Sequence, residues 1–191
     1  MQYNFDEIID RRNTGAIKLE RCKTLFGTTD LLPLWVADMD FRTPDFILDA
    51  IRARLDHPVL GYTMPPKNFY DATWHWIKSH HNWELEKQWI GFVPGIVPAL
   101  SFVVQCFTEP GKEVMVQSPV YYPFFNVIKN NGREVVNNPL RESNAKFEMQ
   151  LADFEAKITE NTQMLLLCNP HNPGGRVWTK DELLQLAAVC E

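Results

Sequence analysis

The spacing of hydrophobic residues from residue 88 onward alternates between two patterns. Short apolar runs predict buried strands at residues 89–93, 113–117, 134–137 and 164–168. Apolar residues at helical spacing predict helices at residues 96–107, 122–130, 151–158 and 180–190. Strands that alternate with helices indicate βαβ units with right-handed crossovers, and therefore a mostly parallel sheet.

The N-terminal part of the chain is less regular. Residues 1–43 contain one short extended segment, at residues 34–37. Thr43-Pro44-Asp45 predicts the start of a helix, because it combines a capping threonine, a proline at the first helical position and an acid in the first turn. We expect a second helix over residues 67–79.

The last helix has a clear start but no clear end. Thr179-Lys180-Asp181-Glu182 predicts a capping box at its N-terminus. Its apolar spacing still continues when the sequence stops at Glu191, and no glycine, basic last turn or proline follows. Because such a helix should return the chain to another strand, we expect an α/β fold that is apparently truncated.

Composition excludes several classes of protein. Hydrophobic residues make up 45% of the 191 residues, which is enough for a core, and the net charge is −5. Without a basic cluster, nucleic acid and anionic membranes are not expected partners. No apolar stretch is long enough to cross a bilayer, and the polar, acidic N-terminus is unlike a secretory signal. Four cysteines without CxxC spacing fit a reduced, cytoplasmic setting.

Three predicted strands are followed by turns that could bind a ligand. Gly95 lies at a strand-to-helix turn, where free N–H groups and the helix dipole favour an anion, although this motif taken alone fits an ordinary βα turn better. Tyr121 follows the next strand and could stack on a planar ring, or simply pack in the core. Asn172 lies in the turn NPHNPGG at the carboxyl end of a strand, where open α/β sheets bind ligands. The density of proline and glycine there favours a site over a structural turn.

Asp38 and Asp40 offer a different chemistry. An apolar segment followed by Asp-x-Asp resembles the nucleophile motif of haloacid-dehalogenase phosphatases, which act with magnesium. Arg42 stands where that motif has a small hydroxyl residue, so this interpretation is the minority alternative. The histidines are scattered, and we expect solvated or core roles for His57, His75 and His171 and no metal site.

Taken together, these motifs resemble the fold-type-I pyridoxal 5'-phosphate (PLP) enzymes of the aspartate aminotransferase superfamily. The similarity is greatest to the MalY/PatB-like cystathionine β-lyase branch. It rests on Asp10-Arg11, LPLWVADMDF at 32–41, Gly61-Tyr62, Pro94-Gly95, SPVY at 118–121 and LLLCNPHNPGGRVWTKDEL at 165–183. The resemblance covers the N-terminal half of such enzymes and implies their three-layer, mostly parallel large domain over residues 46–191. Residues 1–45 would form an N-terminal arm belonging to the small domain.

The resemblance also implies a role for individual residues. The backbone N–H groups of Gly95, Ile96 and Val97 would hold the PLP phosphate, Tyr121 would stack on the pyridine ring, and Asn172 would bind the ring's phenolic oxygen. Tyr62 would reach the phosphate of a neighbouring subunit, so that a homodimer shares its active sites. Val36 and Ala37 would approach the carboxylate of an amino-acid substrate.

The catalytic residues implied by the resemblance are not in this sequence. The lysine that forms a Schiff base with PLP is expected beyond Glu191, so we expect the 191-residue chain alone to be inactive. The intact parent is expected to be a C–S β-lyase acting on L-cystathionine or cysteine S-conjugates. A PLP-dependent aminotransferase and a non-catalytic interaction fragment remain alternatives.

Overall fold

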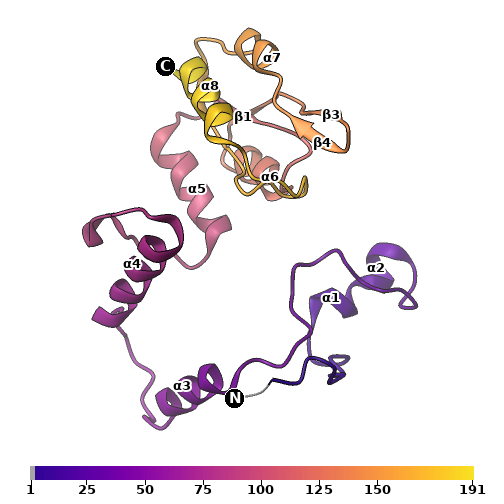
Figure 1. Cartoon of the computed structure of the whole chain (residues 1–191), viewed down its shortest axis with the longest axis vertical. Helices are drawn as coiled ribbons and strands as arrows, with labels where there is room; N and C mark the ends of the chain where they lie inside the picture. The colour runs from indigo at the N-terminus through magenta and orange to yellow at the C-terminus, as the bar shows by residue number, and fades with distance from the viewer. Residues whose placement is uncertain (1–2) are drawn as a thin grey trace. The chain divides into compact units, whose positions relative to one another are not determined.

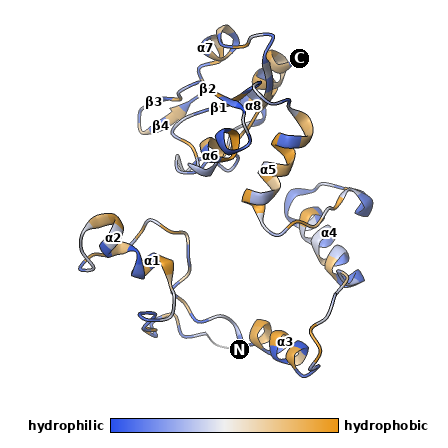
Figure 2. Ribbon diagram, turned by 180° about the vertical axis from the view of Figure 1, so that it is seen from behind, coloured by the Kyte–Doolittle hydropathy of each residue, from blue (hydrophilic) through white to orange (hydrophobic). Residues whose placement is uncertain are grey.

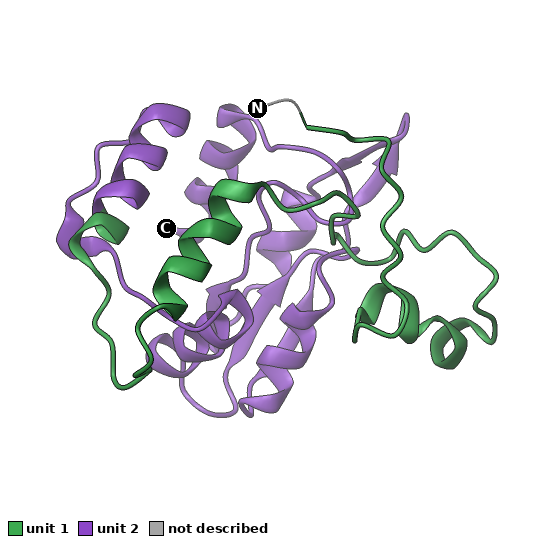
Figure 3. Ribbon diagram, turned by 90° about the horizontal axis from the view of Figure 1, so that it is seen from below, with its two compact units in different colours: residues 1–70 green, residues 71–191 purple. Residues whose placement is uncertain are grey.

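The protein is described here from a computed structural model, which describes residues 3–191 (Figure 1). The chain divides into two compact units, Met1–Tyr70 and Asp71–Glu191, which are coloured separately in Figure 3. This division differs from the boundary expected at residue 45. The assignment of the two segments to a small and a large domain stays a prediction.

The first unit contains short helices joined by irregular chain. Its helices are α1 (Ile17–Glu20), α2 (Cys22–Phe26), α3 (Asp45–Leu55) and the start of α4 (Lys67–His81). The predicted helix starts at Asp45, but Thr43 does not cap it, because the N-cap is Pro44 and no side chain bonds to the free N–H groups. Neither α3 nor α4 has a buried residue.

The extended segment expected at residues 34–37 forms no strand. This segment is a bend and extended chain, without a neighbouring strand to pair with. Side-chain bonds hold it instead: the indole N–H of Trp35 donates to the carbonyl oxygen of Lys18 at 3.0 Å. A strand needs a ladder partner, and an apolar run alone cannot supply one.

The second unit is a small parallel sheet with helices on both faces. After the 3₁₀ turn η1 (Lys87–Trp89), its elements are α5 (Ile96–Phe107), β1 (Glu113–Val116), α6 (Pro123–Asn130), β2 (Glu134–Asn137), β3 (Arg141–Ser143), β4 (Lys146–Glu148), α7 (Leu151–Ala156), β5 (Thr162–Leu165) and α8 (Lys180–Cys190). The sheet order is β2-β1-β5, and β1 is parallel to both neighbours. The predicted α/β class and parallel pairing are therefore confirmed.

Side chains of the central strand alternate between two cores, which gives the three layers. Val114 and Val116 point to a cluster that includes Val104 of α5 and Ile128 of α6. Met115 points to the opposite face, where its cluster contains residues of α7 and α8. Figure 2 shows α5 as largely hydrophobic, and Val104 is its buried residue.

Three other local predictions differ from the structure. Residues 89–93 form the end of η1 and irregular chain, since no described strand lies beside them to complete a ladder. Strand β5 begins before the predicted run and ends at Leu165, because pairing with β1 sets its limits. The connection predicted as polar contains the antiparallel hairpin β3–β4, whose turn residues Asn144 and Ala145 both have positive φ, as two-residue hairpin turns require.

Candidate active site

Helix α5 runs antiparallel to the strands and brings its N-terminus to the carboxyl edge of the sheet. Its C-terminal end lies at the amino edge, where Arg133, just before β2, bonds to Thr108. The N–H of Glu109 donates to the side chain of Gln163, at the start of β5, at 2.8 Å. A helix of this length extends about 18 Å, which exceeds the length of the neighbouring strands. Gly95 therefore lies at the edge where the strands end.

The start of α5 presents two unpaired amides. Gly95 has φ +116°, in the region that favours glycine, and its N–H donates to the carbonyl oxygen of Val93 at 2.8 Å. No side chain caps the helix, and Pro98 has no N–H, so the N–H groups of Ile96 and Val97 remain without acceptors among residues 3–191. These two amides and the positive end of the helix dipole form a site suited to an anion.

Tyr121 follows β1 at the same edge. It is half-buried and packs against the core cluster between the sheet and helices α5 and α6. Its ring meets Phe124 edge to face, with 6.1 Å between ring centroids. The first turn of α6 thus supports one side of the ring.

Asn172 follows β5 and presents a free side-chain amide. The residue is exposed, and its side chain makes no hydrogen bond with any described residue. Its backbone is held, since its N–H donates to the Sγ of Cys168 at 3.2 Å. Asn169 closes the same loop by accepting a hydrogen bond from the N–H of Trp178 at 3.2 Å. A fixed backbone with a free amide is suited to binding one acceptor or donor of a ligand.

A hydrogen bond joins the loops that carry Tyr121 and Asn172. The Nε2 of His171 lies 2.8 Å from the carbonyl oxygen of Pro119. This contact differs from the solvated or core role expected for His171. A histidine between two Asn-Pro steps, in a turn that follows a buried strand, was the signal available.

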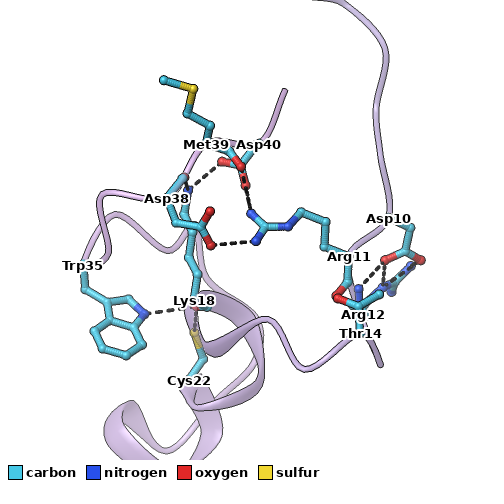
Figure 4. A network of polar contacts seen from close by, with 10 residues as sticks. All are labelled: Asp10, Arg11, Arg12, Thr14, Lys18, Cys22, Trp35, Asp38, Met39 and Asp40. Carbon is cyan, nitrogen blue, oxygen red and sulfur yellow. Dashed lines mark hydrogen bonds and ion pairs between the residues drawn. The ribbon is translucent and has the colours of Figure 1, made fainter. Parts of the chain in front are cut away.

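Val36, Ala37 and Tyr62 belong to the first unit, whereas the sheet belongs to the second. Tyr62 is fully exposed. The segment that contains Val36 and Ala37 continues into a charged network, shown in Figure 4. Whether these three residues contribute to a ligand site stays a prediction.

The network joins two basic and two acidic side chains. Arg11 contacts Asp38 at 2.6 Å and Asp40 at 3.1 Å, and the Nζ of Lys18 contacts Asp40 at 2.6 Å. The Nζ of Lys18 also donates to the carbonyl oxygen of Asp38 at 2.9 Å (Figure 4). This buried lysine therefore binds the backbone of Asp38 and the side chain of Asp40. Its hydrogen bond holds the pKa of Asp40 below the ordinary value, and the bond to Asp38 raises the pKa of Arg11.

These contacts contradict the phosphatase alternative. The nucleophile of that motif follows a strand, whereas the chain before Asp38 is irregular. Both carboxylates form ion pairs, Asp38 with Arg11 and Asp40 with Arg11 and Lys18, and Asp40 ties the segment to α1.

Comparison with known proteins finds relatives along nearly the whole chain. Curated relatives include the cystathionine β-lyase PatB of Bacillus subtilis, 45% identical over 98% of this chain and 49% of that protein. The protein MalY of Escherichia coli is 32% identical over 99% of the chain and 49% of its own length. The chain therefore spans about half the length of the curated relatives it matches.

Solved structures give the same result. Cystalysin from Treponema denticola, which contains a pyridoxal 5'-phosphate cofactor, matches with a TM-score of 0.91 and 36% identity, over 99% of this chain and 49% of that one. The PLP-bound C-S lyase from Staphylococcus hominis matches with a TM-score of 0.90 and 37% identity, over 99% and 48%. Residues 29–191 match the family described as aminotransferase class I and II. The chain belongs to the aminotransferase class I and II family.

Proposed function

We propose that the protein containing this chain is a PLP-dependent C–S β-lyase that acts on L-cystathionine or related cysteine S-conjugates. The single observation that carries this proposal is the arrangement at the carboxyl edge of the sheet. Two free helix amides, the loop of Tyr121 and the free amide of Asn172 lie at that edge. The cystathionine β-lyases and C-S lyases among the relatives favour this reaction.

The residues present fit PLP in three respects. The amides of Ile96 and Val97 suit its phosphate dianion, since an anion at a helix N-terminus meets unpaired donors and a favourable dipole. The half-buried ring of Tyr121 offers a face or edge to an aromatic ring. Asn172 can donate its side-chain N–H to a ring oxygen without breaking an existing bond.

The chain's contribution to the reaction is to bind and orient. PLP supplies the electron sink that makes the substrate's Cα proton removable. Donation from Asn172 to the ring oxygen would favour one orientation of the ring. The phosphate held by Ile96 and Val97 would anchor the opposite end. The N–H of Gly95 donates to the carbonyl oxygen of Val93 and so is not free for the phosphate. Gly95 contributes the backbone conformation that starts the helix.

We infer that the 191-residue chain is inactive by itself. The lysine expected to attach PLP and to move the Cα proton is proposed to lie beyond Glu191. The proposal further includes a cytoplasmic homodimer in which Tyr62 reaches the partner's phosphate and Val36 and Ala37 meet the substrate carboxylate. Neither nucleic acid nor a membrane is part of this proposal. Among residues 3–191, no helix has the length and apolar character needed to cross a membrane.

A chimera tests this function. The chain is fused to the part of Bacillus subtilis PatB that follows the matched half, and PLP and L-cystathionine are added. We expect pyruvate and ammonia from the chimera and none from the 191-residue chain. The Asn172→Ala chimera should bind PLP about tenfold more weakly, as expected for one lost hydrogen bond to a charged or ionisable group.

Two results would contradict the proposal. A folded chimera that binds no PLP would exclude the cofactor site. A chimera that binds PLP but only exchanges amino groups between amino acids and keto acids would favour the aminotransferase alternative, which the family description itself supports.

A further inference from the structure

His171 is the most completely enclosed histidine in the described chain, and the proposed function leaves it without a role. Its residue surface is 4% exposed. Its N–H donates to the carbonyl oxygen of Arg176 at 2.7 Å, and its own carbonyl accepts from Gly175 at 2.9 Å. The backbone of the loop is therefore closed around this residue.

The ring of His171 faces two carbonyl oxygens. Nε2 lies 2.8 Å from Pro119, a normal hydrogen-bond distance, while Nδ1 lies 3.4 Å from Cys168. A carbonyl oxygen can only accept, so the short contact requires a proton on Nε2. The histidine thus acts as a donor from the β5 loop to the β1 loop.

Neighbouring rings leave the imidazole little freedom. Trp178 meets it edge to face at 5.4 Å between centroids, and Phe147 of β4 lies at 6.5 Å. Gly174 completes the enclosure, because a Cβ atom there would lie 2.6 Å from the Cδ2 of His171 and 2.8 Å from Phe147. The absence of a side chain at Gly174 lets the ring reach Pro119.

We propose that His171 is a positioning residue that sets the spacing between Tyr121 and Asn172 across the cofactor site. Pro119 lies two residues before Tyr121, and His171 directly precedes Asn172. Because His171 of the β5 loop donates a hydrogen bond to the backbone of the β1 loop, a shift of one loop moves the other. This inference rests on the proposed function only for the identity of the ligand.

The first test needs no ligand. Amide hydrogen exchange is measured in the PatB chimera without PLP for wild type, His171→Phe, His171→Gln and His171→Asn. Phenylalanine keeps the ring but removes the donor, glutamine places an amide N–H near the position of Nε2, and asparagine places it near Nδ1. We expect about tenfold faster exchange in residues 118–125 and 169–178 for the phenylalanine and asparagine variants, with recovery in the glutamine variant.

Another variant disturbs the hydrogen bond between His171 and Pro119 without replacing His171. Gly174→Ala keeps His171 but pushes its ring from Pro119, and should also speed exchange in both loops. Unchanged exchange in His171→Phe would overturn the proposal. Equal acceleration in every peptide and all three histidine variants would also overturn it, because that result indicates a role in overall folding only.

The second test adds PLP and inorganic phosphate to the PatB chimera. His171→Phe should weaken PLP binding about tenfold but leave phosphate binding unchanged, since the amides of Ile96 and Val97 are untouched. Equal weakening of both ligands would contradict the positioning role. If the wild-type chimera holds no PLP, the proposed function fails, while the exchange experiment still decides whether His171 couples the loops.

Discussion

Lys18 is a buried cation of the first unit. Its side chain is 8% exposed, and its ammonium group bonds to the carboxylate of Asp40 and the carbonyl oxygen of Asp38. A buried ammonium is unfavourable unless it is paired. The segment that contains Asp38 and Asp40 therefore supplies the partners of the buried ammonium group, and the ammonium group in turn fixes that segment.

Replacing Lys18 by methionine should loosen this segment. The variant leaves the carbonyl of Asp38 unpaired and should lower the free energy of unfolding by about 1–3 kcal/mol. Chemical denaturation of the variant checks this value. Lys23→Met is the matched control, because Lys23 lies exposed on the neighbouring helix, and a loss of similar size there would contradict the role of Lys18.

The same variant should shift a titration. Because Lys18 lowers the pKa of Asp40, the pair stabilises the fold above the ordinary carboxyl pKa, and this contribution is lost as pH falls toward the lowered value. NMR titration should therefore give a higher pKa for Asp40 in Lys18→Met. An unchanged pKa would show that Arg11 alone controls the carboxylate.

Single residues also show how far sequence reasoning reaches. The sequence places Tyr121 and Asn172 after predicted strands, and in the structure His171 joins their loops; the ligand roles of both residues stay predictions. Lys18 was missed, because its partners lie more than a helical repeat away and no local pattern indicates a pair separated by 20 or 22 residues. Long-range ion pairs depend on the path of the chain.

At the scale of elements, helix α8 has a complete N-terminal cap. The Oγ1 of Thr179 accepts the N–H of Glu182, and the carboxylate of Glu182 accepts the N–H of Thr179, so the predicted capping box is confirmed. Burial raises the pKa of Glu182, and its bonds to Thr179 lower it; the net result is a lowered pKa. Helix α8 therefore begins at a fixed point next to Trp178.

Thr179→Ala should weaken this start. The loss of an N-cap costs about 1 kcal/mol, and we expect a decrease of that size in the free energy of unfolding. The control is Thr43→Ala, because Thr43 precedes α3 but bonds to none of its N–H groups. Equal losses for both variants would contradict the difference between the two helix starts.

Element limits were predicted best where local signals agreed with tertiary packing. Helices α5 and α8 and strand β2 match their predicted ranges. Residues 89–93 were equally apolar but formed no strand, since strand formation depends on a neighbour that spacing in the sequence cannot reveal. The β3–β4 hairpin was missed because its turn contains neither Asn-Gly nor another strong turn pair.

Over the whole molecule, hydrophobic side chains are unevenly buried. The second unit contains both core clusters, whereas Leu32, Leu34 and Met39 of the first unit are each more than 80% exposed. Exposed apolar surface on this scale marks a region that normally contacts other protein or that aggregates.

The 191-residue chain should therefore bind a hydrophobic dye such as anilinonaphthalene sulfonate and self-associate. Fluorescence titration and light scattering measure the two effects, with the PatB chimera as the control. We expect the chimera to bind less dye at equal concentration. A monomeric, two-state melt of the isolated chain without dye binding would contradict this expectation.

The burial of β1 restricts which residues of this unit can change during evolution. Val114, Met115 and Val116 are fully enclosed between the helical layers, so almost any substitution there would reduce stability. The loops that follow β1 and β5, which carry the proposed ligand-binding groups, lie outside that enclosure. Substrate preference can therefore diverge among descendants of one ancestral scaffold through exchanges in these loops, while the interior stays nearly constant.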